Sequence, residues 1–514
     1  GIGIGAGKLR PLGAPIRNGD ATHTGVIPFF KFWQDAVKSC SQGGVRGGSA
    51  TLYYPFFHLE VEDLLVLKNN KGTEFNRLRQ LDYGVQFNRM AYERLVEGGN
   101  ITLLNPHDVP GLYDAFFECP DHFKELYEKA ERNPKIRKKV IPAVQFFSAF
   151  MQERKDTGRI YLANMDNINI QGSFIPGIST VRMSNLCVEI TLPTSPVYNV
   201  FDAEARSEIA LCILSALNVG ILKPEEYERI AHLAVRALDN LIDLQAYMMP
   251  EAEWPARQRR TLGIGVVNFA YWRAKNDLKY QDIDREGLQK VHQLAETMAF
   301  NITKASVDLA KERGACERFN ETKYSLGMFP KDTYKKNLDE LVDNTLVHDW
   351  DKLLADMRMY GIRNSTTMAG MPAETSALVL NATNGFEAPR SLVSVKQSKD
   401  GVLAQVVPEI RRLKNKYDLL WDQKSPRGYL SIMAVWQKFF DQAISVNTTY
   451  NPAFYEGNEL PMSVLLQDIL FHYKYGGKTL YYFNTNDGAG ELEIEAKPVA
   501  QLPQDDDDCE SCKI

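Results

Sequence analysis

The chain has 514 residues, of which 44% are hydrophobic and 24% are charged, and its formal net charge is −5. This composition is typical of a globular protein, and the length predicts about two to four domains. The negative charge argues against nucleic acid as a partner, and no apolar run reaches the roughly 18 residues of a membrane span. The seven cysteines, odd in number and scattered, indicate a reducing compartment such as the cytoplasm.

The predicted elements alternate between strands and helices. Apolar stretches of period 2, or continuously β-branched and aromatic, predict strands over 49–61, 101–104, 181–192 and 478–484. Helical periodicity predicts helices over 223–248, 284–313, 428–446 and 463–475. This mixture indicates an α/β body. The composition turns acidic after residue 485, which predicts a flexible tail over 486–514.

The helix predicted over 223–248 carries an apolar stripe. Its members recur at helical spacing and are Ile230, Leu233, Leu238, Leu241 and Ile242. Such a pattern predicts that these side chains share one buried face.

The segment CSQGGVRGGSA, residues 40–50, packs four glycines around Gln42 and Arg46. It predicts a loop that can change conformation and bring its backbone close to a ligand. Gln and Arg side chains suit a base edge or a phosphate, although a plain surface loop also fits.

The stretch VRMSNLCVEITLPT is the first candidate reacting centre. If it is extended, alternation places Asn185, Cys187 and Glu189 on one face. A half-buried strand with a polar side toward solvent would explain the pattern. However, cysteine prefers burial, so a thiol between an amide and a carboxylate is also a candidate for catalysis.

Other motifs have plain alternatives too. Cys212 lies in the apolar segment EIALCILSALNVG and is interpreted as a core residue. Pro372 precedes a predicted helix start whose free N–H groups could bind phosphate, at Glu374, Thr375 and Ser376. Many helices begin this way and bind nothing.

Two pairs of adjacent tyrosines lie in predicted strands. They are Tyr481–Tyr482 in KTLYYFNT and Tyr53–Tyr54 in TLYYPFF. Their spacing is the same, so it does not indicate which pair, if either, has a functional role.

The chain ends in QDDDDCESCKI. Cys509 and Cys512 could supply half of a zinc site, form a local disulfide, or act as a mobile dithiol. The eight histidines form no ligand cluster, so no metal is predicted in this chain.

Together, motifs along nearly the whole chain resemble the large, catalytic subunit of class Ia ribonucleoside-diphosphate reductases. They include VKSCSQGGVRGG, LEVEDLLVLKNNKG, TGRIY, SNLCVEI, NATNGFEAPR, KTLYYFNT and CESCKI. The resemblance implies a ten-stranded α/β barrel, built from two parallel five-stranded half-barrels around a central finger loop. It also implies radical-based reduction of ribonucleoside diphosphates for deoxyribonucleotide synthesis.

The resemblance assigns roles by motif. Cys187 would be the thiyl radical that takes the ribose 3′-hydrogen, and Glu189 would be the base on the 3′-hydroxyl. Asn185 would hydrogen-bond the substrate. Cys212 would supply one of the two reducing thiols, which overturns its interpretation as a core residue.

Radical transfer would run from Tyr482 to Tyr481 to Cys187. A separate small subunit, with a tyrosyl radical and a di-iron centre, would supply the oxidant, and this chain would bind no such cofactor. No role is implied for Tyr53 or Tyr54.

The resemblance also implies nucleotide sites and redox partners. Glu374, Thr375 and Ser376 would bind the substrate diphosphate, and Gln42 and Arg46 would lie on the loop that links substrate choice to an effector. The phosphates of that effector, ATP or a deoxynucleotide, would meet Arg10 and Arg17. Cys509 and Cys512 would re-reduce the active site and then exchange with thioredoxin or glutaredoxin. The assembled large subunit would be a homodimer.

One departure from the family concerns the second reducing cysteine, which in the family precedes the motif matching GIGIGAGKLR. None of Cys40, Cys119 and Cys316 lies in a matching motif. We therefore expect a split large subunit, in which a separate N-terminal fragment supplies the first barrel strand and the N-terminal domain. The incomplete barrel would span 1–320, a second α/β part 321–485, and the redox tail 486–514.

Three alternatives remain at this stage. A cobalamin-dependent reductase would not need the tyrosine pair. A general dithiol carrier would need only its tail, and a non-catalytic fragment would bind nucleotides or assemble without turnover.

Overall fold

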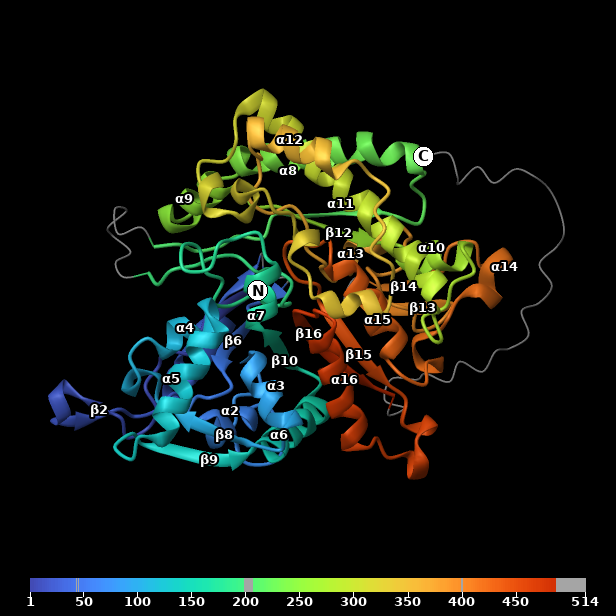
Figure 1. The fold of residues 1–514 in the computed structure, drawn as a ribbon. Coiled ribbons are helices and arrows are strands. Elements are labelled where there is room, and N and C mark those ends of the chain that lie inside the picture. The colour runs from blue at the N-terminus through green and yellow to red at the C-terminus, as the bar shows by residue number, and fades with distance from the viewer. Residues whose placement is uncertain (43, 45, 198–206, 399–400, 487–514) are drawn as a thin grey trace.

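The structure is a computed structural model that describes residues 1–42, 44, 46–197, 207–398 and 401–486 (Figure 1). The strands are β1 (Ile2–Gly5), β2 (Pro15–Ile16), β3 (Ala21–Thr22), β4 (Ser41–Gln42), β5 (Arg46–Gly47), β6 (Ala50–Pro55), β7 (Asp82–Phe87), β8 (Asn100–Leu104), β9 (Lys138–Pro142), β10 (Ile160–Asn164), β11 (Leu214–Asn218), β12 (Gly263–Val267), β13 (Val393–Ser398), β14 (Gly401–Val406), β15 (Val446–Tyr450) and β16 (Thr479–Thr485).

The α-helices are α1 (Ile27–Lys38), α2 (Val61–Leu65), α3 (Arg89–Val96), α4 (Leu112–Glu118), α5 (Pro120–Arg132), α6 (Ala143–Thr157), α7 (Met165–Gln171), α8 (Tyr227–Leu244), α9 (Pro250–Arg259), α10 (Phe269–Lys275), α11 (Arg285–Arg313), α12 (Trp350–Tyr360), α13 (Thr375–Val379), α14 (Ile410–Leu413), α15 (Arg427–Gln437) and α16 (Met462–Lys474).

A six-stranded sheet lies at the centre, in the order β1-β6-β7-β10-β16-β15. The first four strands are parallel to one another, and β15 is parallel to β16. β10 and β16 are antiparallel, so two parallel groups meet at that junction. Figure 1 shows β10 and β16 near the middle of the molecule, although they come from opposite halves of the chain.

Backbone hydrogen bonds continue beyond β15. Gly370 donates to Ala443 over 2.9 Å, and Leu262, next to β12, donates to Thr366 over 3.0 Å. β12 then pairs in parallel with β11. The described residues nevertheless form no closed barrel. The α/β class is thus observed, but the ten-stranded barrel is not.

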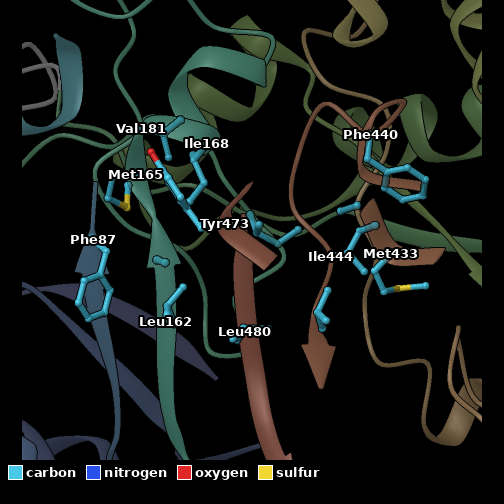
Figure 2. Close-up of a cluster of buried hydrophobic side chains, with 14 of the residues drawn as sticks. Phe87, Leu162, Met165, Ile168, Val181, Met433, Phe440, Ile444, Tyr473 and Leu480 are labelled. Carbon is cyan, nitrogen blue, oxygen red and sulfur yellow. The ribbon is translucent and has the colours of Figure 1, made fainter. Parts of the chain in front are cut away.

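The three central strands explain where the core lies. Every residue of β6, β7 and β10 is buried. This is expected for parallel strands with both faces covered, and α6 and α7 pack against β10. Figure 2 shows part of this core, in which Phe87, Leu162 and Leu480 lie on the neighbouring strands β7, β10 and β16.

Most predicted elements are present, but two predicted features of the helices are wrong. The predicted helix 428–446 stops with α15 at Gln437. Beyond it, the Asp441 carboxylate accepts hydrogen bonds from the backbone N–H groups of Thr367 and Met368, which fixes this segment against a neighbouring extended segment. In α8, Leu233 and Leu241 are 53% and 50% exposed, whereas Leu238 and Ile242 are buried. At 100° per residue, the predicted stripe spreads over about half of the helix, too wide for one packed face.

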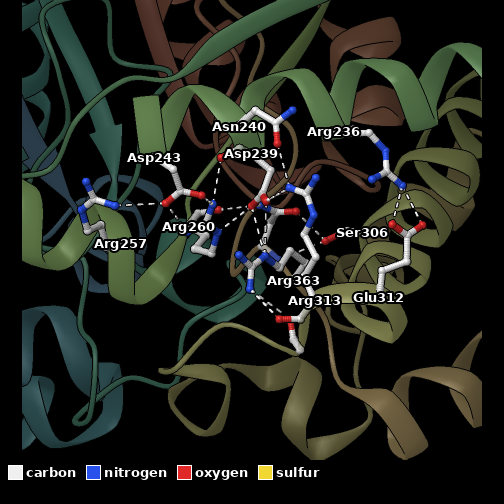
Figure 3. A network of polar contacts seen from close by, with 12 residues as sticks. Arg236, Asp239, Asn240, Asp243, Arg257, Arg260, Ser306, Glu312, Arg313 and Arg363 are labelled. Carbon is white, nitrogen blue, oxygen red and sulfur yellow. Dashed lines mark hydrogen bonds and ion pairs between the residues drawn. The ribbon is translucent and has the colours of Figure 1, made fainter. Parts of the chain in front are cut away.

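A buried carboxylate ties α8 to its surroundings. Asp239 accepts hydrogen bonds from Arg260, Arg313 and Arg363, as Figure 3 shows. The closest contact joins the Arg260 Nε and Asp239 Oδ1 atoms at 2.6 Å, and both side chains are buried. This network therefore links α8 to the end of α11 through Arg313. It also links α8 to the residues just before β12 through Arg260, and to the segment after α12 through Arg363.

We predict that Asp239→Ala destabilises the fold. Loss of the carboxylate removes one of the two ion-pair partners of the buried Arg260 guanidinium, the other being Asp243, and breaking a buried pair costs about 3 kcal/mol or more. The midpoint of thermal unfolding should therefore fall. Glu312→Gln is the matched control because it removes an exposed partner of Arg236 in the same region. Equal midpoints for the two variants would contradict the prediction.

Candidate active site

Residues 181–192 form an irregular loop with a turn at Leu186–Cys187, so the predicted strand is wrong. Side chains from the sheet hold this loop. Thr51 Oγ1 donates to the Leu186 carbonyl over 2.9 Å, and Gln86 Nε2 donates to the Arg182 carbonyl over 2.7 Å. Two carbonyl groups of the loop are thus satisfied by side chains of β6 and β7, and not by backbone groups of a neighbouring strand.

Two glycines allow the close approach of the loop. A Cβ atom at Gly3 would lie 1.8 Å from the Ser184 carbonyl oxygen. At Gly84 it would lie 2.4 Å from the Tyr53 ring, whose hydroxyl donates to the Asn185 carbonyl. The glycines of GIGIG therefore serve contact between β1 and the loop, and Tyr53 belongs to the site although sequence reasoning gave it no role.

Val188 has a backbone φ of +65°, which is unusual for a β-branched residue and costs about 1–3 kcal/mol. Its side chain is fully buried among Tyr53, Tyr161 and Tyr481. This packing stabilises the strained conformation at Val188. Because of that conformation, the backbone from Cys187 to Glu189 is not extended, and the side chains do not alternate between two faces as they would in a strand.

The predicted polar residues do converge. Asn185 Nδ2 donates to Glu189 Oε1 over 2.9 Å and lies 3.8 Å from Cys212 Sγ. Ser445 Oγ donates to the Cys187 carbonyl over 2.6 Å and lies 3.2 Å from Glu189 Oε2. Sequence reasoning missed Ser445 because no motif marks it.

Burial raises the pKa values of the groups at this site. Loss of water raises the pKa of Glu189 above its usual value, against hydrogen bonds from its own backbone, Asn185 and Ser445 that lower it. Desolvation, followed by the Glu189 charge, raises the pKa of Cys187 to about 12. Cys212 remains accessible to solvent, yet the surrounding protein and Glu189 also raise its pKa to about 12. Both thiols therefore hold their protons at neutral pH.

The two tyrosines of β16 extend from the sulfur of Cys187. The Tyr481 hydroxyl donates to Cys187 Sγ over 3.5 Å, and the hydroxyl oxygens of Tyr481 and Tyr482 are 2.7 Å apart. Their ring centroids are 3.8 Å apart. The structure thus distinguishes the two tyrosine pairs, because an unbroken contact path joins Tyr482, Tyr481 and Cys187.

Other buried groups support this path. Arg154 donates to the Tyr481 carbonyl over 2.7 Å, which fixes β16 beside β10. The Tyr161 ring lies 4.8 Å from that of Tyr481, and its hydroxyl donates to Asp82 over 3.0 Å. Tyr161 lies in the TGRIY motif, which was its only sequence signal.

A cavity of about 410 Å³ opens beside the tyrosines, lined in part by Glu374, Glu387, Asn447, Tyr481 and Tyr482. Glu374 precedes α13, so the predicted helix start is confirmed. Thr375 and Ser376 follow it and are exposed.

The other residues predicted to bind nucleotides or to carry electrons lie away from this cavity or outside the residues that the structure describes. Arg10 and Arg17 are exposed near the small β2–β3 hairpin. The backbones of Gln42 and Arg46 pair across the β4–β5 hairpin, but their side chains lie outside the described part. Cys509 and Cys512 also lie outside the described residues.

Within the described residues, no group of three or more His, Cys, Asp or Glu side chains is arranged to hold a metal ion. Over the same residues, no helix has both the length and the apolar content to cross a membrane.

Comparison with known proteins identifies the family. The family described as "Ribonucleotide reductase, barrel domain" matches residues 1–483. The chain belongs to the ribonucleotide reductase family. Its relatives include the ribonucleoside-diphosphate reductase subunit alpha of Haemophilus influenzae, which is 53% identical over 100% of this chain and 67% of the relative.

Two further relatives agree. Ribonucleoside-diphosphate reductase 1 subunit alpha of Escherichia coli is 53% identical, and the alpha subunit of enterobacteria phage T4 is 47% identical. Each match covers 100% of this chain and 67% of the relative. This reductase chain thus spans about two thirds of the length of these relatives.

We predict that the raised pKa of Cys212 controls its alkylation. Below a pKa of about 12, the thiolate fraction increases tenfold per pH unit, so the alkylation rate should rise about tenfold per unit between pH 8 and 10. Peptide mapping by mass spectrometry measures this rate, with exposed Cys40 as an internal control for digestion. A rate that levels off below pH 9 would contradict the raised pKa.

Proposed function

We propose that this chain carries out the radical-based reduction of ribonucleoside diphosphates to 2′-deoxyribonucleoside diphosphates. The observation that carries the proposal is the contact path from Tyr482 through Tyr481 to Cys187, which ends beside Glu189 and Cys212. The names of the relatives agree with it. A general dithiol carrier would have no use for such a path, so that alternative is not favoured.

Radical transfer along this path moves an electron and a proton together. Burial raises the pKa values of Tyr481, Tyr482 and Cys187, so charged phenolate and thiolate forms are disfavoured. An oxidised Tyr482 would take a hydrogen atom from Tyr481, which would then take one from the Cys187 thiol. A small subunit with a di-iron tyrosyl radical would supply the initial oxidant.

The thiyl radical at Cys187 would then take the 3′-hydrogen of the ribose. Glu189 would accept the proton of the 3′-hydroxyl, and its raised pKa makes it a better base near neutral pH. The 2′-hydroxyl would leave as water, while Cys212 and a second thiol supply two electrons and two protons and become a disulfide. Cys187 would then return the hydrogen atom to C3′. Asn185 would hold the substrate beside both groups.

The remaining proposed contacts follow the family resemblance. The substrate diphosphate would bind at Glu374, Thr375 and Ser376, and the Gln42–Arg46 loop would respond to an effector nucleotide bound near Arg10 and Arg17. Cys509 and Cys512 would return electrons from thioredoxin or glutaredoxin. A homodimer in the cytoplasm stays part of the proposal.

We predict that Cys187→Ser abolishes deoxynucleotide formation, because a hydroxyl cannot replace the sulfur as the hydrogen-abstracting radical. The assay uses the assembled reductase, with the small subunit, a nucleoside diphosphate and a reductant. Cys119→Ser changes an exposed cysteine outside the site and should retain activity. Turnover by Cys187→Ser at the wild-type rate would refute the proposed function.

Tyr482→Phe should lower the rate of nucleotide reduction by at least a thousandfold, because phenylalanine has no hydroxyl to pass on a hydrogen atom. Tyr54→Phe is the matched control, since the Tyr54 hydroxyl is buried and has no hydrogen-bond partner among the described residues. Comparison of the two rates under identical conditions tests the path. Full activity of Tyr482→Phe would favour a different radical source, such as a cobalamin.

A further inference from the structure

Ser445 immediately precedes β15 and contacts the two groups at the centre of the proposed chemistry. Its side chain is only 8% exposed and lies at the wall of the cavity. Its hydroxyl is 2.6 Å from the Cys187 carbonyl oxygen and 3.2 Å from Glu189 Oε2. None of the sequence motifs that resemble the family contains Ser445.

The backbone around Ser445 is held firmly. Ser445 N donates to the Gly370 carbonyl over 2.9 Å, and Ala443 N donates to the Glu189 carbonyl over 3.0 Å. The segment 443–445 therefore contacts Glu189 twice: the Ala443 N–H group bonds to its backbone carbonyl, and the Ser445 hydroxyl bonds to its carboxyl group. Small displacements of this segment would move the carboxyl group and the Cys187 loop together.

The two Glu189 oxygens have different partners. Asn185 Nδ2 donates to Oε1, whereas the Ser445 hydroxyl faces Oε2. The titratable groups near this carboxyl group are Cys187 on the same loop, Cys212 before β11 and Tyr53 on β6. All three are neutral at ordinary pH, so the hydrogen bonds to its oxygens are what oppose the loss of water, which is the largest influence on its pKa.

A hydroxyl group carries only one hydrogen. When Glu189 is protonated, its O–H group can donate to Ser445 Oγ while Ser445 donates to the Cys187 carbonyl. When Glu189 is ionised, its carboxylate is the stronger acceptor and competes for the Ser445 hydrogen. The direction of this hydrogen bond therefore follows the protonation state of Glu189.

We propose that Ser445 is a positioning residue, whose hydroxyl fixes the Glu189 carboxyl group against the Cys187 loop and changes acceptor when Glu189 loses its proton. This inference rests on the proposed function, in which Glu189 is the base. It adds a coupling between the base and the backbone of the radical cysteine.

The test is the pH dependence of kcat/KM for Ser445→Ala in the assembled reductase. The Ser445 hydrogen bond lowers the pKa of Glu189, so its removal should raise that pKa. The acid limb of the profile should then shift upward by about one pH unit. If the alanine variant does not fold, Ser445→Cys, which keeps only a weak S–H donor, should shift the limb in the same direction.

Ser431→Ala is the matched control. Ser431 is also 8% exposed, and its hydroxyl donates to the Arg427 carbonyl within α15, away from the loop. Its acid limb should coincide with that of the wild type.

An acid limb unchanged in the folded Ser445 variant, with wild-type enzyme active, would overturn this inference alone. Absence of nucleotide reduction by the assembled wild-type enzyme would instead refute the proposed function.

Discussion

The contact between the Tyr481 hydroxyl and the Cys187 sulfur joins two segments that are 294 residues apart in the chain. It requires β16 to lie beside β10 and the 181–192 loop to lie over β1 and β6. The β10–β16 pairing, the Arg154 hydrogen bond to the Tyr481 carbonyl and the space left by Gly3 all serve this one placement. These features of the fold together hold the Cys187 sulfur next to the Tyr481 hydroxyl.

The electrostatic character of the site follows from its burial. Thiols, phenols and the Glu189 carboxyl group all have pKa values above their usual ranges, chiefly because they have lost water. Neutral forms favour movement of hydrogen atoms over movement of separate charges. Asp239 and its arginines form a separate network of buried charge that stabilises helix packing.

The sequence predicted the elements with strong periodicity, including α11, α16 and β16, because their patterns agree with their burial. It failed for the Cys187 loop, since a φ of +65° at Val188 depends on packing against three distant tyrosines. The convergence of Asn185, Cys187 and Glu189 was predicted from strand alternation and is reached by a different backbone. Motif resemblance singled out Cys212 and the tyrosine pair, which lie near Asn185 and Cys187, whereas no local pattern in the sequence marks the contacts of Ser445 and Tyr53 with the loop.

An experimental structure of residues 181–192 together with β16 tests the central claim most directly. We expect Cys187 Sγ at about 3.5 Å from the Tyr481 hydroxyl and a left-handed backbone at Val188. An extended strand at this position, with the sulfur directed away from Tyr481 and Glu189, would contradict the account.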